Sequence, residues 1–118
     1  MIKFSVLYPY SEGCWFDAKY YVEKHIAPYR EDPLVKGILV ESGSSARNFV
    51  DPPRYACIAH FFYDSLEDLE ASRNPQRVAS QIQDNVNFTN IQGTNLVSTL
   101  PYCRLDGLKL CGQAGGHP

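Results

Sequence analysis

Residues 54–63, with the sequence RYACIAHFFY, read as a β-strand that is apolar on both of its sides. Alternate side chains of a strand point to opposite faces of its sheet. The two sets are Tyr55, Cys57, Ala59 and Phe61 on one side, and Ala56, Ile58, His60 and Phe62 on the other. A sheet that is apolar on both faces must be covered on both. We therefore expect this strand to lie in a sheet with two covering layers.

Three further segments have strand character. Residues 2–8 are β-prone and end at the turn-prone stretch PYSEG at 9–13. Residues 34–41, LVKGILVE, read as a second strand, and a long loop rich in Gly, Ser and Pro follows it. Residues 91–102 can supply a last strand that runs into Pro101. The chain therefore offers four strands.

Two helical segments separate these strands. In the first, Asp17 can cap a helix whose face carries Tyr21 and His25, and Pro28 is expected to end or bend that helix. In the second, residues 65–68 (SLED) have the form of a capping box, and Asn74-Pro75 has the form of a second helix start. The second piece places Val78, Ala79 and Ile82 on one face.

The order strand, helix, strand, strand, helix, strand predicts an α+β fold, a ferredoxin-like βαββαβ domain with an antiparallel sheet and both helices on one face. The chain then has no helix left for the other apolar face. A second copy, related by a two-fold axis, is the economical cover, so we expect a homodimer. We place the domain at residues 1–102 and a C-terminal tail at 103–118.

Composition and charge exclude several classes of partner. The 118 residues, 44% of them apolar, suit one domain, and 11 Lys and Arg against 13 Asp and Glu leave no basic stripe for nucleic acid. No run of eighteen apolar residues and no signal segment is present, so we expect a cytoplasmic protein that does not bind membranes.

The four cysteines imply neither a metal site nor a disulfide framework, because they are scattered without a CxxC pair. We expect free thiols, with a pairing of Cys103 and Cys111 in the tail as the exception to consider. No phosphate-binding glycine loop, HExxH or GxSxG motif is present. The sequence therefore predicts no cofactor.

Three blocks of the chain resemble the EthD family, named from ethyl tert-butyl ether degradation. Residues 16–28 (FDAKYYVEKHIAP) resemble its first helix, residues 58–65 (IAHFFYDS) its third strand, and residues 88–91 (FTNI) its approach to the last strand. The resemblance spans residues 2–100 and is more specific for fold than for function. The 103–118 tail, Cys14 and Trp15 depart from the family pattern.

This resemblance implies a dimeric α+β barrel. The superfamily also holds muconolactone isomerases, polyketide-tailoring cyclases and monooxygenases that work without a metal or a flavin.

His25 and His60 are the only internal histidines and, with Tyr21, the candidate catalytic residues. If His60 points towards the helices, the two imidazoles face one cavity, where their mutual repulsion keeps at least one neutral and basic. The alternative is that each is a hydrogen-bonded core residue. A tyrosine, most plausibly Tyr21, would orient a substrate oxygen. Candidate substrate-binding residues are Tyr8, Trp15, Tyr29 and Phe62.

These residues favour a cofactor-independent enzyme performing acid–base chemistry, namely isomerisation, cyclisation or dehydration, on a small apolar oxygenated catabolic or polyketide-like intermediate. Two alternatives stay open. One is a non-catalytic protein that binds such a molecule for an oxidative degradation pathway, and the other is a cofactor-free monooxygenase. The expected partners are a second copy of the chain and a small organic ligand.

Overall fold

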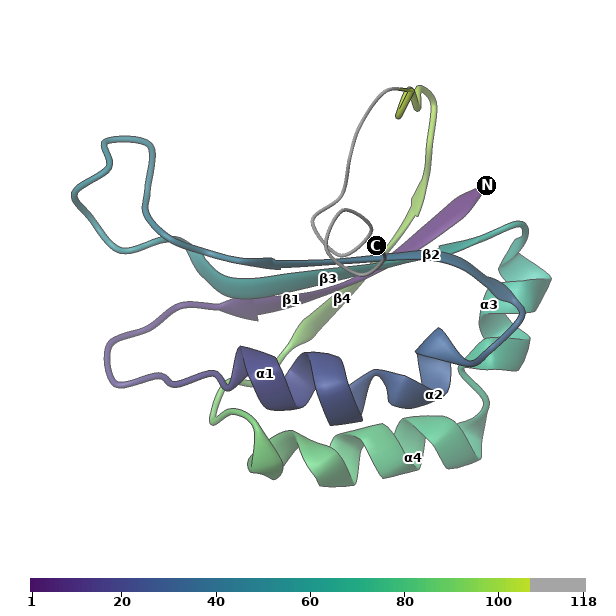
Figure 1. Ribbon diagram of the computed structural model, residues 1–118, viewed down its shortest axis with the longest axis horizontal. Helices are drawn as coiled ribbons and strands as arrows, with labels where there is room; N and C mark the ends of the chain where they lie inside the picture. Colours follow the sequence, from purple (N-terminus) through teal and green to yellow (C-terminus); the bar gives the residue numbers. More distant parts are fainter. Residues whose placement is uncertain (107–118) are drawn as a thin grey trace, which may run out of the picture.

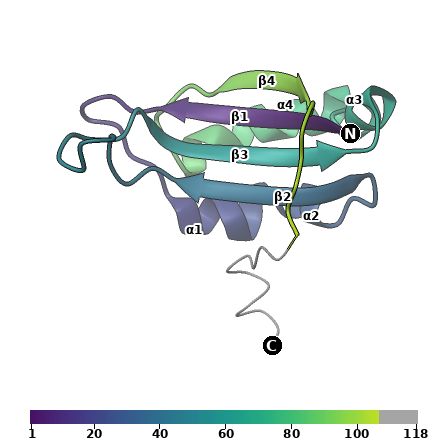
Figure 2. The same cartoon turned by 90° about the horizontal axis from the view of Figure 1, so that it is seen from above.

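The computed structural model describes residues 1–106 and consists of one antiparallel sheet with helices against one of its faces (Figure 1). The four-stranded sheet has the order β2-β3-β1-β4 (Figure 2). Its strands are β1 (Ile2–Pro9), β2 (Val35–Ser42), β3 (Tyr55–Tyr63) and β4 (Thr94–Thr99). All neighbouring strands are antiparallel. The predicted ferredoxin-like α+β fold is confirmed.

The helical segments lie in two stretches of the chain. The first contains α1 (Ala18–Tyr20), the π-helix η1 (Tyr21–His25) and α2 (Ala27–Arg30). The second contains α3 (Leu66–Ser72), α4 (Pro75–Asp84) and the 3₁₀ turn η2 (Asn85–Asn87). Both stretches cover the same face of the sheet (Figure 1).

Helix starts occur where the sequence predicts them, because each has a side-chain cap. Asp17 Oδ1 accepts a hydrogen bond from the Tyr20 amide at 3.0 Å. Ser65 Oγ accepts from the Asp68 amide at 3.1 Å, and Asn74 Oδ1 accepts from the Arg77 amide at 3.0 Å. Such caps satisfy amide groups that the first helical turn leaves unpaired.

The last strand is shorter than predicted. It covers Thr94–Thr99 rather than residues 91–102. At its start, the Ile91 amide bonds to Thr89 Oγ1 at 3.0 Å instead of joining the sheet. At its end, Thr99 pairs with Ile2, the first residue of β1, so no neighbouring strand extends further.

The first helix widens into a π turn before Pro28. The Ile26 amide donates to the Tyr21 carbonyl at 3.1 Å, five residues back. A proline cannot donate to the carbonyl four residues before it, here that of Lys24, and its ring crowds that carbonyl. The π turn η1 therefore precedes Pro28, which lies in the first turn of α2. Such turns are rare and often lie at functional sites.

The core lies between the helices and one face of the sheet. The buried residues of that face come from β1 and β3 and include Phe4, Tyr8, Cys57, Ala59 and Phe61. Buried aromatic residues from outside the sheet pack on them, namely Tyr21, Tyr29 and Phe88. A central layer of aromatic rings thus joins the sheet to the helices.

The other face of the sheet has no helix over it within residues 1–106 (Figure 1). It carries His60, which pairs with Leu39 on β2 and with Ser5 on β1, and Ser5 in turn pairs with Leu96 on β4. Leu39 is 40% exposed and Leu96 is 52% exposed. We call this the open face. A second copy covering it stays a prediction.

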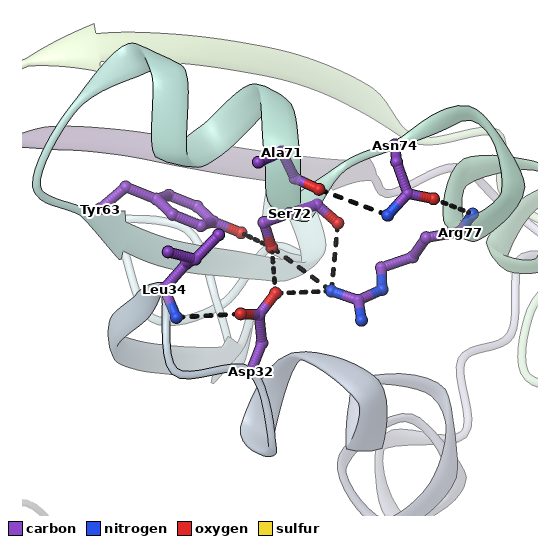
Figure 3. Close-up of polar contacts among 7 residues, drawn as sticks. All are labelled: Asp32, Leu34, Tyr63, Ala71, Ser72, Asn74 and Arg77. Carbon is purple, nitrogen blue, oxygen red and sulfur yellow. Dashed lines mark hydrogen bonds and ion pairs between the residues drawn. The ribbon is translucent and has the colours of Figure 1, made fainter.

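A polar cluster ties the turn after α2 to α3 and α4 (Figure 3). Asp32 Oδ2 accepts hydrogen bonds from Ser72 Oγ at 2.8 Å and from the Arg77 guanidinium at 2.7 Å. Tyr63 bonds to the same Ser72 hydroxyl at 2.9 Å. Burial alone would raise the pKa of the Asp32 carboxyl, but these donors and the Leu34 amide outweigh it and lower that pKa. This ionised cluster fixes α3 and α4 to the sheet.

Within residues 1–106, no helix combines the length and the apolar character needed to cross a membrane. After β4, residues 100–106 pass above the open face from β4 towards β2 (Figure 2). Tyr102 and Leu105 in this segment are exposed. Most of the predicted tail, including Cys111, lies outside the described residues, so its boundary and its pairing with Cys103 stay predictions.

Candidate functional site

A pocket of ≈ 630 Å³ opens between the helix-covered face of the sheet and the helices η1 and α4. Aromatic rings from β1, β3 and the first helical stretch form much of its wall, and amide and hydroxyl side chains form much of the rest. The aromatic group is Phe4, Tyr8, Tyr21, Tyr29 and Phe61, and the polar group includes Gln81, Asn85, Thr89 and Asn95. Apolar walls with a few polar groups are typical of small-molecule sites.

His25 contributes an imidazole to this pocket and is held by a carboxylate. The residue is 6% exposed, and its Nδ1 lies 2.8 Å from Asp84 Oδ2. Burial lowers the pKa of His25, and the hydrogen bond to Asp84 offsets part of that effect. The ring is therefore neutral at pH 7 and donates its Nδ1 hydrogen to Asp84, since a carboxylate can only accept. Nε2 keeps its lone pair and has no hydrogen-bond partner among residues 1–106.

Asp84 is the last residue of α4, and its carboxylate accepts several further hydrogen bonds. Its Oδ1 accepts from the Tyr20 hydroxyl at 2.6 Å and from the Asn87 amide group at 2.9 Å. Burial would raise the pKa of this carboxyl, but the bonds from Tyr20, Asn87 and His25 together lower it. Asp84 thus stays ionised at neutral pH and holds the imidazole in one tautomer.

The His25 ring is also fixed by aromatic neighbours. It stacks on Tyr21, with ring centroids 5.0 Å apart and an interplanar angle of 28°. The Phe88 ring lies 4.4 Å away on a tilted plane. Because η1 brings Tyr21 and His25 to the same side of the helix, the sequence prediction that they share a face is fulfilled.

Two tyrosine hydroxyls of the pocket remain donors at neutral pH. Burial raises the pKa of Tyr8 to about 12 and raises that of Tyr21 further above its usual value. Their rings meet edge to face at 5.7 Å. A protonated phenol can donate a hydrogen bond to a substrate oxygen that gains negative charge.

His60 lies on the open face, so the condition for a cavity shared with His25 is not met. Its Nδ1 is 2.8 Å from Ser5 Oγ and its Nε2 is 2.8 Å from Glu41 Oε1. The reason is the register of β3. Phe61 pairs with Phe4 and points into the core, so His60 must point the other way.

The other predicted site residues also fall into two groups, those that line the pocket and those that lie outside it. Tyr8, Tyr21, His25 and Tyr29 line the pocket, whereas Trp15 and Phe62 do not. Phe62 has the same strand parity as His60, and Trp15 is 48% exposed near the start of the first helix. Cys57 is fully buried, and burial raises its thiol pKa to about 12, so the thiol stays protonated.

Sequence reasoning missed Asp84 and Arg73. Asp84 is the one acidic residue in the segment 75–90, which was the available signal, but its partner His25 is 59 positions away. Arg73 also lines the pocket. Among residues 1–106, no group of three or more His, Cys, Asp or Glu side chains lies close enough to hold a metal ion.

No protein-family model and no curated protein matches the chain. Among solved structures, an EthD-like protein from Ralstonia eutropha is 30% identical, with a TM-score of 0.79 over 89% of this chain and 96% of that one. An ethyl tert-butyl ether degradation family protein from Bacillus halodurans is 17% identical, with a TM-score of 0.64 over 84% and 97%. HapK from Hahella chejuensis is 12% identical, with a TM-score of 0.54 over 86% and 96%. The last two likenesses concern the fold alone.

Proposed function

The chain belongs to the EthD family, and from that premise we propose that it is an acid–base enzyme whose general base is His25. Its reaction is isomerisation, cyclisation or dehydration of a small, largely apolar molecule that carries oxygen. The observation that carries the proposal is the bond between His25 Nδ1 and Asp84, 2.8 Å long, which leaves Nε2 as the basic atom of a neutral ring on the pocket wall.

The chemistry requires only proton movement. Nε2 removes a proton from a carbon beside a carbonyl group, and the electron pair of that bond moves to the carbonyl oxygen. Asp84 stabilises the imidazolium that forms, because the two charges are then in contact. Tyr8 or Tyr21 donates a hydrogen bond to the enolate oxygen. Return of the proton to another atom gives an isomer, while ring closure or loss of water gives the other products. No step needs a cofactor.

A second copy on the open face completes the proposed protein. The apolar side chains there, including Leu39 and Leu96, are too exposed for a face with no cover. Tyr102 and Leu105, in the segment after β4, are also exposed. Covering this face leaves the pocket accessible, because the pocket lies on the opposite side, against the helices. Each protomer then keeps its own site.

The test uses exchange of the acidic α-hydrogens of 2-tetralone in heavy water, followed by proton NMR. We expect the wild-type protein to accelerate exchange above buffer. His25→Gln should lower the rate by about 10²–10⁴-fold, the usual contribution of a general base. His60→Gln is the matched control, since it changes the same residue type on the opposite face. Its rate per folded molecule should equal that of the wild type.

Three results would change the conclusion. Full activity of His25→Gln, corrected for folded fraction, removes His25 as the base. Binding of tetralone without exchange by the wild type favours the accessory binding protein. Oxygen uptake with an electron-rich phenol, in place of exchange, favours the cofactor-free monooxygenase.

A further inference from the structure

Arg73 presents an unpaired guanidinium to the pocket. It follows α3 directly, and its guanidinium carbon lies 4.2 Å from the centre of the Phe4 ring. Its Nε is buried and has no hydrogen-bond partner among residues 1–106, the only side-chain nitrogen or oxygen there in that state. A buried donor left without a partner is costly, by more when it is charged. Because Nε itself is covered by protein atoms, an acceptor in the pocket would bond to the two terminal nitrogens of the guanidinium, which also have no hydrogen-bond partner within residues 1–106.

Arg77, four residues later in α4, is an arginine whose hydrogen bonds are made within the fold. Its guanidinium bonds to Asp32 at 2.7 Å and to the Ser72 carbonyl at 3.1 Å (Figure 3). No carboxylate within residues 1–106 forms an ion pair with Arg73. Arg77 thus has acceptors within the fold, whereas Arg73 packs on the Phe4 ring and has no acceptor within residues 1–106.

Among the side chains of residues 1–106 that line the pocket, the only charge is the positive charge of Arg73. Arg73 is the only Lys or Arg among the lining residues within 1–106, and no Asp or Glu lines the pocket there. His25, as argued above, is neutral at pH 7. The ionised Asp84 lies outside the pocket lining, where Tyr20, Asn87 and His25 bond to it. A ligand with a single negative charge would therefore find one cation on the pocket wall, whereas a second negative charge would find no second cation.

Arg73 and His25 lie towards opposite ends of the pocket. Arg73 sits over Phe4, whereas His25 stacks on Tyr21, whose ring meets that of Tyr8. Phe4 and Tyr8 are four residues apart on β1, which corresponds to about 13 Å along a strand. Phe61 pairs with Phe4, and its ring centroid lies 5.0 Å from that of Tyr29, so the Arg73 end of the wall is aromatic. Val6 lines the pocket between Phe4 and Tyr8. A flat apolar body fits this span.

We propose that the substrate is a monoanionic carboxylic acid of two-ring size, whose carboxylate is bound by Arg73 while its oxygenated end reaches His25. This deepens the acid–base function proposed above and rests on it for the role of His25. A guanidinium matches a carboxylate because two parallel N–H groups meet two oxygens. Arg73 would then orient the substrate so that the carbon losing its proton lies at the imidazole.

The experiment compares two ligands of the same shape by titration calorimetry, 2-naphthoate and the neutral 2-naphthamide. We expect the wild-type protein to bind naphthoate about 10- to 100-fold more tightly, the range for a hydrogen bond to a charged group. Arg73→Met keeps an apolar chain over Phe4 but removes the charge, and should bring the two affinities together. Arg73→Lys, which keeps the charge without the fork, should retain part of the preference.

Arg47→Met is the matched control, because Arg47 is exposed in the loop after β2 and lies outside the pocket. It should keep the wild-type preference. Equal binding of the two ligands by the wild type, no binding of naphthoate, or a preference that survives in Arg73→Met would each overturn the proposal. Tighter binding of 2-naphthyl phosphate than of naphthoate would overturn the carboxylate class.

The anion site and the acid–base function fail separately. His25→Gln should bind naphthoate as the wild type does, because His25 acts on the reacting carbon and not on the carboxylate. An Arg73-dependent preference without exchange of any ketone would leave the anion site standing and remove the base. Exchange of 2-tetralone by His25 without any naphthoate preference would do the reverse.

Discussion

The two faces of the sheet each carry a histidine bonded to a carboxylate at the same distance. On the helix-covered face, His25 Nδ1 lies 2.8 Å from Asp84, and on the open face, His60 Nε2 lies 2.8 Å from Glu41. The difference is the second nitrogen. That of His60 is engaged by Ser5 at 2.8 Å, whereas that of His25 has no partner within residues 1–106. On the open face, both ring nitrogens of His60 are therefore occupied by hydrogen bonds. On the helix-covered face, His25 keeps one nitrogen available as a base.

The surroundings of the carboxylates differ as well. Asp84 has a side chain 25% exposed and accepts from two further donors, whereas the Glu41 side chain is 54% exposed. A well-bonded, half-buried carboxylate holds its partner in a fixed orientation, while an exposed one is weakened by water and salt. A histidine–carboxylate contact therefore says little about function until both ring nitrogens and the partner's own bonds are counted.

The two faces should differ most when the carboxylate beside each histidine is removed. Asp84→Asn should lower the exchange of 2-tetralone by about 10²–10³-fold, a substantial part of the effect of a general base, because the imidazolium loses its counter-charge and the ring its fixed tautomer. Glu41→Gln makes the same change on the open face and should leave the rate per folded molecule unaltered. Equal losses in both variants would erase the functional distinction between the two faces.

The next effect concerns the open face as an interface. Leu96→Glu places a charge on that face and should convert a dimer into a monomer, halving the mass measured by light scattering. Ala79→Glu adds the same charge at an exposed position of α4 and should leave the mass unchanged. A wild-type protein that is already monomeric at micromolar concentration would refute the dimer.

The pH dependence should report His25 and its environment. Burial lowers the pKa of His25 below the ordinary histidine value of 6.5, so kcat/KM should decline at a lower pH than it would with an unperturbed imidazole as the base. Between the lowered pKa and 6.5, the unfolded chain binds a proton that the folded chain does not, so stability should fall as the pH falls through this window. His25→Gln should lose that component in acid-denaturation curves.

Asp84→Asn sharpens this result. The carboxylate raises the pKa of His25 against the effect of burial, so its removal should lower that pKa further and move the decline of kcat/KM to still lower pH. A decline that moves to higher pH would show that Asp84 does not act on His25 through its charge.

The smallest effect tests whether a free nitrogen is enough. Ser5→Ala releases Nδ1 of His60 and leaves this ring with one carboxylate bond and one free nitrogen, like His25. It should lower the free energy of unfolding by about 1 kcal/mol, the net value of one hydrogen bond, measured by denaturant titration. No exchange activity should appear in a Ser5→Ala, His25→Gln double variant, because the open face lacks the pocket. Exchange activity in this double variant would show that a histidine with a free nitrogen is sufficient for catalysis without the pocket.

The sequence predicted what depends on neighbours along the chain. Asp17, Ser65 and Asn74 mark helix starts because a cap and the amides it bonds lie within three residues. The side to which His60 points could not be predicted, since both sets of alternate side chains on β3 are apolar. Only the pairing of Phe61 with Phe4 decides it.

The missed residues depend on distant parts of the chain. Asp84 reaches His25 across 59 positions, and nothing near either residue announces the contact. Arg73 and Arg77 both look like ordinary surface arginines in the sequence. The acceptor that distinguishes them, Asp32, lies 45 positions before Arg77.

The position of His25 depends on the number of residues in the π turn η1. It absorbs one residue more than an α-helical turn, and each helical residue advances the chain by about 100°. Deleting one residue between Tyr21 and His25 would leave an α-helical turn, so the Asp17 amide should keep its 2.7 Å bond to the Phe88 carbonyl, but His25 would follow Tyr21 by three residues instead of four and its ring would leave its present place on the helix face. The exposed positions Val22 and Glu23 should accept many substitutions but no deletion. Scans of residues 21–26 by substitution and by deletion should show that exposed positions accept many different side chains but that the number of residues in this segment cannot change.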